Sequence, residues 1–169
     1  MAAPMFPVNA HRYDPYRTFK FQVLIDAKPV AGLRKMTALK KTTEAVSWRT
    51  AGDPTHERKL PGGTKYEPIT LDQGLTHDPV FEQWANLVNN IQGDGAMSLK
   101  NFRKDIVINV MNLQGKVAVS YKIYRAWVSE FQALPDFDAG TMNAVGIQHI
   151  KLEHEGWERD ISVAEPAET

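Results

Sequence analysis

The stretch KDIVINVMNLQGKVAVSYKIYRAW, residues 104–127, carries the plainest structural signal in the chain. Two segments of alternating apolar and polar residues flank the short turn-forming link NLQG, an arrangement typical of an antiparallel β-hairpin. On the second strand, one face holds Val117, Val119, Tyr121 and Ile123, and the other holds Ala118, Ser120, Lys122 and Tyr124. We expect the apolar face to pack on a core. The small polar face suits a water-lined surface or a subunit contact, although an ordinary sandwich with one wet face also fits the composition.

The same two-residue period recurs on both sides of this hairpin. It predicts further strands in TFKFQVLID (18–26), residues 33–39, KTTEAVSW (41–48), YEPITLDQGL (66–75), WVSEFQAL (127–134) and GIQHIKLEHEGWERD (146–160). One helix is predicted at about 79–92, with Asp78 as N-cap, Pro79 at the first position and Gly93 as the stop. Its core side chains would be Phe81, Trp84, Leu87, Val88 and Ile91. The expected fold is therefore mainly β, a small β-barrel or sandwich of two antiparallel sheets with about seven or eight strands and one flanking helix.

The composition bounds the class of protein. The chain has 169 residues, which suits a single domain over 1–169, and 43% of them are hydrophobic. Lys and Arg number 20, as do Asp and Glu, so the zero formal charge argues against a dedicated nucleic-acid-binding domain. The absence of cysteine excludes disulfides, thiolate metal sites and a cysteine nucleophile. We see no signal peptide and no apolar run long enough for a membrane span, so we expect synthesis in the cytoplasm.

No motif points to catalysis or to a cofactor. Gly62-Gly63-Thr64-Lys65 is not a phosphate-binding P-loop, because the order of residues differs and a strand follows where a helix is required. The five histidines are scattered, and the spacing of His149 and His154 places them on opposite faces of a strand, where they cannot share a metal ion. Glu153 and Glu155 fit a solvated charged row. We expect no catalytic, cofactor-binding or metal-binding residues.

Three segments show no regular alternation of apolar and polar residues. Residues 1–17 read as an irregular N-terminal arm, residues 160–169 as a flexible acidic tail, and residues 50–65 as a long polar connection. Connections of that length inside a compact domain are usually functional or mobile. The composition of 50–65 is also that of an ordinary solvated surface loop.

The order of these features resembles one known family. VAGL (30–33), TTEAVSWR (42–49), RKLPGGTKYEPITLDQGLTHD (58–78), FEQWANLV (81–88) and GIQHIKLEHEGWER (146–159) together resemble the tail-tube protein family of contractile phage tails and phage-tail-like contractile injection systems. The resemblance runs from about Phe19 to Arg159. It departs from the family at Ala27, where Gly is common, and in the longer N-terminal arm.

The resemblance implies an assembly function. Subunits of this family form hexameric rings that stack into a hollow tube, which a contracting sheath drives through a target envelope while the lumen carries DNA or a protein effector. Residues 33–49 and 105–125 would hold the channel-lining strands, with lumen-facing candidates Lys41, Thr43, Ser47, Ser120 and Lys122. Residues 50–65 would form a ring-stacking loop with inter-subunit contacts at Gly52, Asp53, Arg58, Lys59, Leu60, Pro61, Gly62 and Lys65.

The same resemblance implies the partners. They are further copies of the chain, a sheath protein, baseplate or spike proteins, a terminator and the cargo, without specific nucleic-acid recognition. The final location would be a phage tail or a tail-like particle. Two other functions stay open: a tube-initiator paralogue that forms only the ring between spike and tube, and a monomeric ligand-binding β-barrel, which a dry apolar cavity would support.

Overall fold

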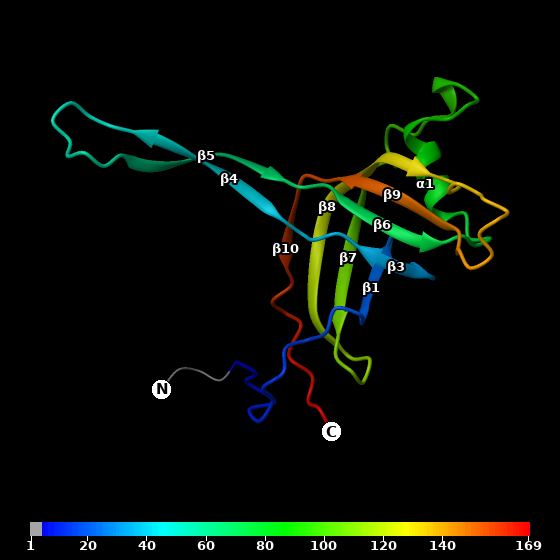
Figure 1. Cartoon of the computed structure of the whole chain (residues 1–169), viewed down its shortest axis with the longest axis horizontal. Coiled ribbons are helices and arrows are strands. Elements are labelled where there is room, and N and C mark those ends of the chain that lie inside the picture. The colour runs from blue at the N-terminus through cyan, green and yellow to red at the C-terminus, as the bar shows by residue number, and fades with distance from the viewer. Residues whose placement is uncertain (1–4) are drawn as a thin grey trace.

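The computed structural model describes residues 5–169, so residues 1–4 of the predicted N-terminal arm lie outside the described residues. It consists of a two-layered body and one long two-stranded projection (Figure 1). The elements in chain order are β1 (Phe21–Ile25), β2 (Lys28–Pro29), β3 (Leu33–Met36), β4 (Lys41–Trp48), β5 (Arg58–Tyr66), β6 (Ile69–Gly74), α1 (Val80–Val88), the short 3-10 helix η1 (Asp94–Ala96), β7 (Lys104–Met111), β8 (Val117–Gln132), β9 (Ile147–Glu153) and β10 (Gly156–Arg159).

The predicted hairpin at 104–127 is confirmed as β7 and β8. Its turn is closed by the Asn112 side chain, whose Oδ1 accepts the Lys116 N–H at 2.9 Å, and Gly115 supplies a φ of 82°. Around this hairpin the body strands pair antiparallel in the order β2-β1-β7-β8-β9-β6-β3, with β10 also on β8. The mainly β fold with one α-helix is therefore as predicted. The strand order ends at β2 and β3, so this sheet is not a closed barrel.

A bulge in β8 carries the strand from one layer of the body to the other. Lys104 pairs with Ala126 and Ile106 with Ile123, which leaves two residues of β8, Tyr124 and Arg125, opposite a single residue of β7. Arg125 has a φ of 53°, and its N–H donates to Asp105 Oδ1 at 3.0 Å. Such bulges bend a strand and increase its twist.

Because of this bend, the boundaries of two predicted strands were wrong. The strand expected at 127–134 is the second half of β8, which pairs with β9, whereas the first half pairs with β10. The long last strand expected at 146–160 is consequently split into β9 and β10, because its two halves follow the two directions of β8. Gly156 begins β10 with a φ of 148°.

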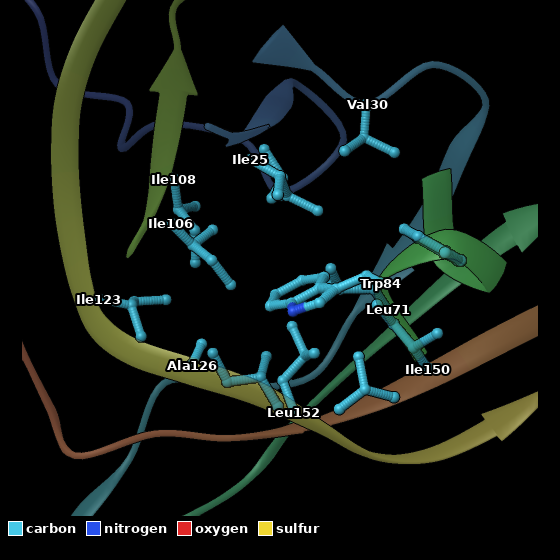
Figure 2. Close-up of a cluster of buried hydrophobic side chains, with 14 residues drawn as sticks. Ile25, Val30, Leu71, Trp84, Ile106, Ile108, Ile123, Ala126, Ile150 and Leu152 are labelled. Carbon is cyan, nitrogen blue, oxygen red and sulfur yellow. The ribbon is translucent and has the colours of Figure 1, made fainter. Parts of the chain in front are cut away.

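The core lies between the two layers and is filled by α1 side chains. Figure 2 shows Trp84 surrounded by branched side chains from both layers, including Ile106 and Ile123 on one side and Ile150 and Leu152 on the other. The indole Nε1–H of Trp84 donates to the Phe102 carbonyl oxygen at 2.8 Å, so the one polar atom of this side chain is satisfied. Ile123, on the predicted core face of β8, has no exposed surface, but Val117, Val119 and Tyr121 of that face are only half-buried. Ala118 and Ser120, on the face predicted to be wet, are buried, so the predicted division of β8 into a core face and a wet face holds only in part.

The helix is shorter than predicted at both ends. Pro79 takes the N-cap position, while Asp78 Oδ1 accepts the Val80 N–H at 3.2 Å. At the other end the returning chain donates Ser98 N–H to the Leu87 carbonyl oxygen at 3.1 Å. In a longer helix that carbonyl would accept the Ile91 N–H. Asn89 is already extended, with a φ of −147° and a ψ of 129°, so the helix ends at Val88 and Ile91 is fully exposed rather than part of the core.

Candidate functional site: assembly surfaces

The projection, here called the arm, comprises β4, β5 and the connecting residues 49–57. Residues 50–65 were predicted as one long connection, but residues 58–66 form β5 and pair with β4 from Lys41–Tyr66 to Trp48–Arg58. Every residue of β4 is exposed. Neither face of the arm meets a core within the chain, so the burial that normally imposes a two-residue period is missing, and the strand gave no clear pattern.

One face of the arm is polar. Alternation along β4 places three of the predicted lumen-facing residues, Lys41, Thr43 and Ser47, on the same face. Two of them are tied to β5: Thr43 and Thr64 share a hydroxyl–hydroxyl hydrogen bond of 2.8 Å, and Lys59 Nζ donates to Ser47 Oγ at 2.5 Å. The hydrogen-bonding side chains on this face therefore form two groups, with Ala45 and Pro61 between them.

The opposite face of the arm is apolar toward its tip. Val46, Trp48 and Leu60 lie there, each close to half exposed at 48%, 48% and 47%. The Arg58 guanidinium carbon lies 5.8 Å from the centre of the Trp48 ring. Nearer the body this face carries the ion pair between Lys65 and Glu44, with 3.6 Å between Nζ and Oε1. Apolar side chains exposed together on a strand pair are typical of a contact surface.

The tip is shaped by Asp53. Its carboxylate accepts the Thr50 N–H at 2.9 Å and an Arg58 N–H at 3.1 Å, and Gly52 provides a φ of 93°. Among the other predicted ring-stacking residues, Gly62 lies close to the facing strand, since a Cβ there would be 2.9 Å from Val46 Cγ2. The predicted stacking role of these residues stays a prediction.

An aromatic cluster joins the base of the arm to the body. Trp157 lies edge-on to Tyr66 and to Tyr121, with ring centroids 6.5 and 5.8 Å apart, and Lys41 Nζ lies 5.6 Å from the Trp157 ring centre. Gly156 lies beside the Tyr66 ring, where a Cβ would be at the ordinary contact distance of 3.4 Å; its φ of 148° rather than the contact favours glycine. No local pattern in the sequence indicates this cluster, because its members come from four strands.

The remaining lumen candidates lie on the body and differ from each other. Ser120 is buried, and its Oγ donates to Asn109 Oδ1 at 2.8 Å across the β7–β8 ladder. This corrects the prediction for Ser120, because a buried hydroxyl cannot line a channel. Lys122 is exposed, and its Nζ lies 3.1 Å from Asp160 Oδ2. Hydrogen bonds from the Ser162 hydroxyl and from Lys122 lower the pKa of Asp160 to about 2.

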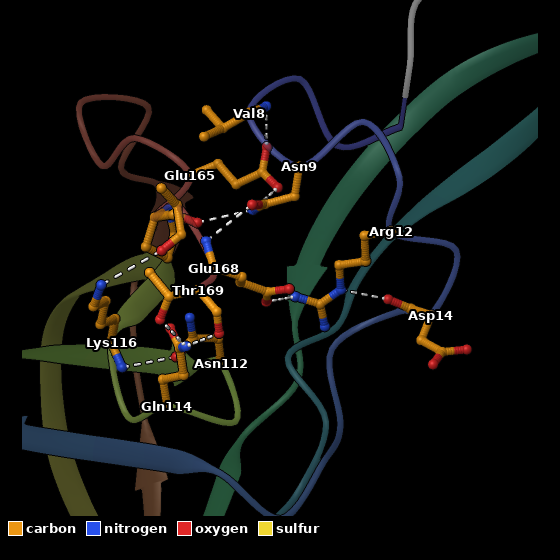
Figure 3. Close-up of polar contacts among 12 residues, drawn as sticks. Val8, Asn9, Arg12, Asp14, Asn112, Gln114, Lys116, Glu165, Glu168 and Thr169 are labelled. Atoms are coloured by element: carbon orange, nitrogen blue, oxygen red, sulfur yellow. Dashed lines mark hydrogen bonds and ion pairs between the residues drawn. The ribbon is translucent and has the colours of Figure 1, made fainter.

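The two ends of the chain bind each other in an arrangement here called the terminal clasp (Figure 3). Asn9 Nδ2 donates to Glu165 Oε1 and to the Pro166 carbonyl oxygen, both at 2.8 Å, and Asn9 Oδ1 accepts the Glu168 N–H at 2.9 Å. Arg12 pairs with Glu168 and lies over the Tyr16 ring at 4.3 Å. Burial and the nearby Glu165 raise the pKa of Tyr16. The tail was expected to be flexible, but it is bonded along much of its length.

The described residues contain little that could support chemistry. Among residues 5–169, no group of three or more His, Cys, Asp or Glu side chains could hold a metal ion. His149 Nε2 lies 3.1 Å from Glu130 Oε1, and His154 Nε2 lies 2.9 Å from the Glu67 carbonyl oxygen. No helix in this part of the chain is both long and apolar enough to cross a membrane.

These surfaces define a class of protein before any comparison is made: a compact β subunit with an exposed two-faced arm, suited to assembly rather than to catalysis. The comparison with protein families gives the particular family. Residues 17–158 match the family described as T4-like virus tail tube protein gp19, and the chain belongs to this family. Because the family is one of structural tail tube proteins, the expectation that the chain is not an enzyme is confirmed by its membership.

Solved structures of contractile injection systems share the fold. The chain is 25% identical to a chain in the cryo-EM structure of the anti-feeding prophage tube terminating cap, with 88% of this chain and 93% of that chain covered and a TM-score of 0.72. A chain in the PVC sheath/tube terminator structure is 20% identical, with coverage of 88% and 98% and a TM-score of 0.73. One in the PVC sheath-tube complex is 22% identical, with coverage of 86% and 91% and a TM-score of 0.69. No curated protein matches the chain.

Proposed function

We propose that the chain is the repeating inner-tube subunit of a contractile phage tail or a contractile injection system. In this function, hexameric rings of the chain stack into a hollow tube, the tube is driven through a target envelope when a surrounding sheath contracts, and the lumen carries DNA or a protein effector. The observation that carries the proposal is the arm, because beyond the aromatic cluster at its base it has no packing partner within the subunit.

Energetics favour a partner for the arm. A two-stranded hairpin without a packed face is marginally stable in water, and three or more strands or a covering element are normally needed. Both outer edges of the β4–β5 pair are open in this subunit. Open edges pair readily with further strands, so neighbouring copies would complete the sheet and remove an aggregation hazard. Repeated head-to-tail pairing of this kind closes a ring when the rotation between subunits is right.

The two faces of the arm suggest its orientation in such a ring. The apolar face with Val46, Trp48 and Leu60 would lie on a neighbouring subunit, since burying it removes hydrocarbon from water. The polar face with Lys41, Thr43 and Ser47 would then point to the channel, where a wet surface lets cargo pass without sticking. The predicted contacts at Arg58, Lys59 and Lys65 would belong to the inter-subunit or inter-ring surface.

The partners follow from the same function. Structures that share the fold are described as a sheath-tube complex, a sheath/tube terminator and a baseplate. These descriptions support a sheath around the proposed tube, a baseplate or spike at one end and a terminator at the other.

Electron microscopy of the purified full chain tests the proposal directly. We expect negative-stain images with six-fold rings or stacked tubes and a stain-filled channel, together with a fast-sedimenting species. The variant Val46→Glu places a charge on the apolar face and should abolish rings, whereas Thr43→Glu on the polar face is the matched control and should keep them. A uniform monomer at high concentration, with no rings even when sheath or baseplate proteins are added, would rule the function out.

A second function, a ring restricted to one end of the tube, is favoured by a specific observation. Chains from a cap, a terminator and a baseplate structure share the fold with TM-scores of 0.72, 0.73 and 0.70, as closely as the chain from the sheath-tube complex does. The same images distinguish the two functions: isolated rings that never stack indicate a terminal ring, and long stacks indicate the main tube.

A further inference from the structure

The connection between β8 and β9, residues 133–146, is a long exposed segment that combines apolar and acidic side chains. Leu134, Phe137, Met142 and Val145 are 61%, 71%, 92% and 76% exposed. Asp136 and Asp138 lie among them, and the segment contains no Lys or Arg. Connections of this length are usually functional, and clustered exposed apolar side chains mark contact surfaces.

Local hydrogen bonds hold the shape of this segment. Asp138 Oδ1 accepts the Gly140 N–H at 2.9 Å, and Oδ2 accepts the Thr141 hydroxyl at 3.3 Å. At its far end, the Leu75 N–H donates to the Gly146 carbonyl oxygen at 3.0 Å, which ties the segment to the end of β6. The segment therefore presents its apolar side chains from a defined backbone path. Asp136 makes no such turn contact, so its carboxylate is available to a partner.

A groove of complementary chemistry lies elsewhere on the body, between the beginning of β1 and β3. It has a volume of about 430 Å³, and its apolar lining includes Phe21, Met36 and Ile108. Arg17, Arg34 and Lys35 also line it, and no acidic residue does. None of these three cations forms an ion pair with any side chain of residues 5–169. The outer edge of β3 is also without a strand partner in the body sheet, because β3 ends the strand order.

We propose that the segment 133–146 of one subunit docks in the β1–β3 groove of the next subunit around the ring, a contact that rests on the proposed function. A closed ring of identical subunits needs two different surfaces that fit each other, because each contact is head-to-tail. The segment is apolar and acidic, whereas the groove is apolar and basic. Apolar contact supplies the affinity, and the opposite charges at the rim select this pairing over others. The segment extends beyond the ends of β8 and β9, away from the terminal clasp (Figure 1).

Cysteine cross-linking tests the contact without background, because the chain has no native cysteine. Two single variants are prepared, Phe137→Cys in the segment and Ala38→Cys in the groove lining. When they are mixed and co-assembled, a short bis-maleimide should yield a cross-linked dimer on a denaturing gel, and either variant assembled alone should yield none. A mixture of Ala38→Cys with Val46→Cys reports whether the arm occupies the groove instead. Cross-linking in that mixture but not in the first would overturn the proposal.

Charge reversal supplies a second and independent readout. Asp136→Arg and Arg34→Asp should each raise the protein concentration needed for ring formation at least about tenfold, and the two changes in one chain should largely restore it. Unchanged ring formation in both single variants, together with no cross-link, would overturn the docking while the rings themselves uphold the proposed function. A wild-type chain that forms no rings at all would overturn both.

Discussion

The adjacent glycines of β5 allow a matched test of whether the arm acts as a rigid assembly element. Gly62 and Gly63 oppose the single residue Glu44 in the β4–β5 ladder, and neither has a positive φ. A Cβ on Gly62 would lie 2.9 Å from Val46 Cγ2 and 3.2 Å from the Glu44 carbonyl oxygen, whereas a Cβ on Gly63 would meet no atom within 4 Å. Gly62→Ala should therefore distort the arm, and Gly63→Ala should leave its geometry intact.

The expected difference in assembly between Gly62→Ala and Gly63→Ala can be estimated because the entropic contribution is the same in both variants. Each Gly→Ala change reduces the entropy of the flexible state by a similar amount, worth about 0.4–1 kcal/mol, so this contribution drops out of the comparison. What remains is the overpacking at Gly62, typically about 1–3 kcal/mol. If assembly requires the native arm, the concentration at which half of the protein is in rings should be roughly 5-fold to 160-fold higher for Gly62→Ala than for Gly63→Ala.

Sedimentation velocity over a dilution series measures this concentration, and far-UV circular dichroism confirms that the body of each variant is folded. Equal midpoints for the two variants would show that the arm adjusts freely or takes no part in assembly. A larger defect in Gly63→Ala than in Gly62→Ala would contradict the packing argument itself.

Three further predictions concern the body and the chain ends. Trp84→Ala should lower the free energy of unfolding by about 3–5 kcal/mol in urea denaturation and Trp84→Phe by clearly less, because phenylalanine refills most of the space between the layers; equal losses would contradict a packed core. The pKa of Asp160 is lowered from 3.8 to about 2, so this carboxylate should stabilise the fold fully above about pH 4 and lose its contribution as the pH falls toward 2. An NMR titration midpoint near 3.8 in the folded protein, unaffected by Ser162→Ala, would contradict the observed hydrogen bonds. Asn9→Ala removes three hydrogen bonds of the terminal clasp and should speed amide hydrogen exchange in residues 163–169, by an amount that corresponds to about 1–3 kcal/mol of local stability; unchanged exchange would show that the clasp does not hold the tail.

Strands that bury one face within the subunit were predicted well. The alternation in residues 104–127 located β7 and β8, and Ile123 on the expected core side of β8 is buried. The alternation did not show that Ala118 and Ser120 on the other side of β8 are buried as well. In β9, which was also predicted from alternation, Ile150 and Leu152 on one face are buried. A single burial surface imposes a two-residue period, and the turn residues after Met111 mark where the period restarts.

The helix was predicted in position but not in length. Its apolar spacing placed Phe81 and Trp84 in the core, where both are buried. The pattern continues to Ile91, but the chain is extended from Asn89 onward, and the Ser98 N–H occupies the Leu87 carbonyl to which a longer helix would bond Ile91. Competition of this kind comes from a neighbouring segment and leaves no trace in the helical pattern.

The candidate site was predicted unevenly. Residues 41–48 were recognised as a strand. Lys41, Thr43 and Ser47 lie on one face of it, because alternate residues of a strand share a face. Residues 58–65 were taken as part of a loop, because an arm exposed on both faces has no pattern of burial. The terminal clasp and the aromatic cluster at the arm base were not predicted, since their members lie far apart in the chain.

Local order in this protein can be read from its residues wherever burial is one-sided, since each such strand records in its own alternation which side faces the core. The change of layer in β8 depends on something else. Tyr124 and Arg125 have ordinary strand neighbours, and their bulge arises from the competing registers of β7, β9 and β10 on one long strand. The pairing of Asn9 with Glu165 likewise requires the folded body to bring the two chain ends together. Such long-range contacts form because the whole chain is compact, and no single stretch of residues specifies them.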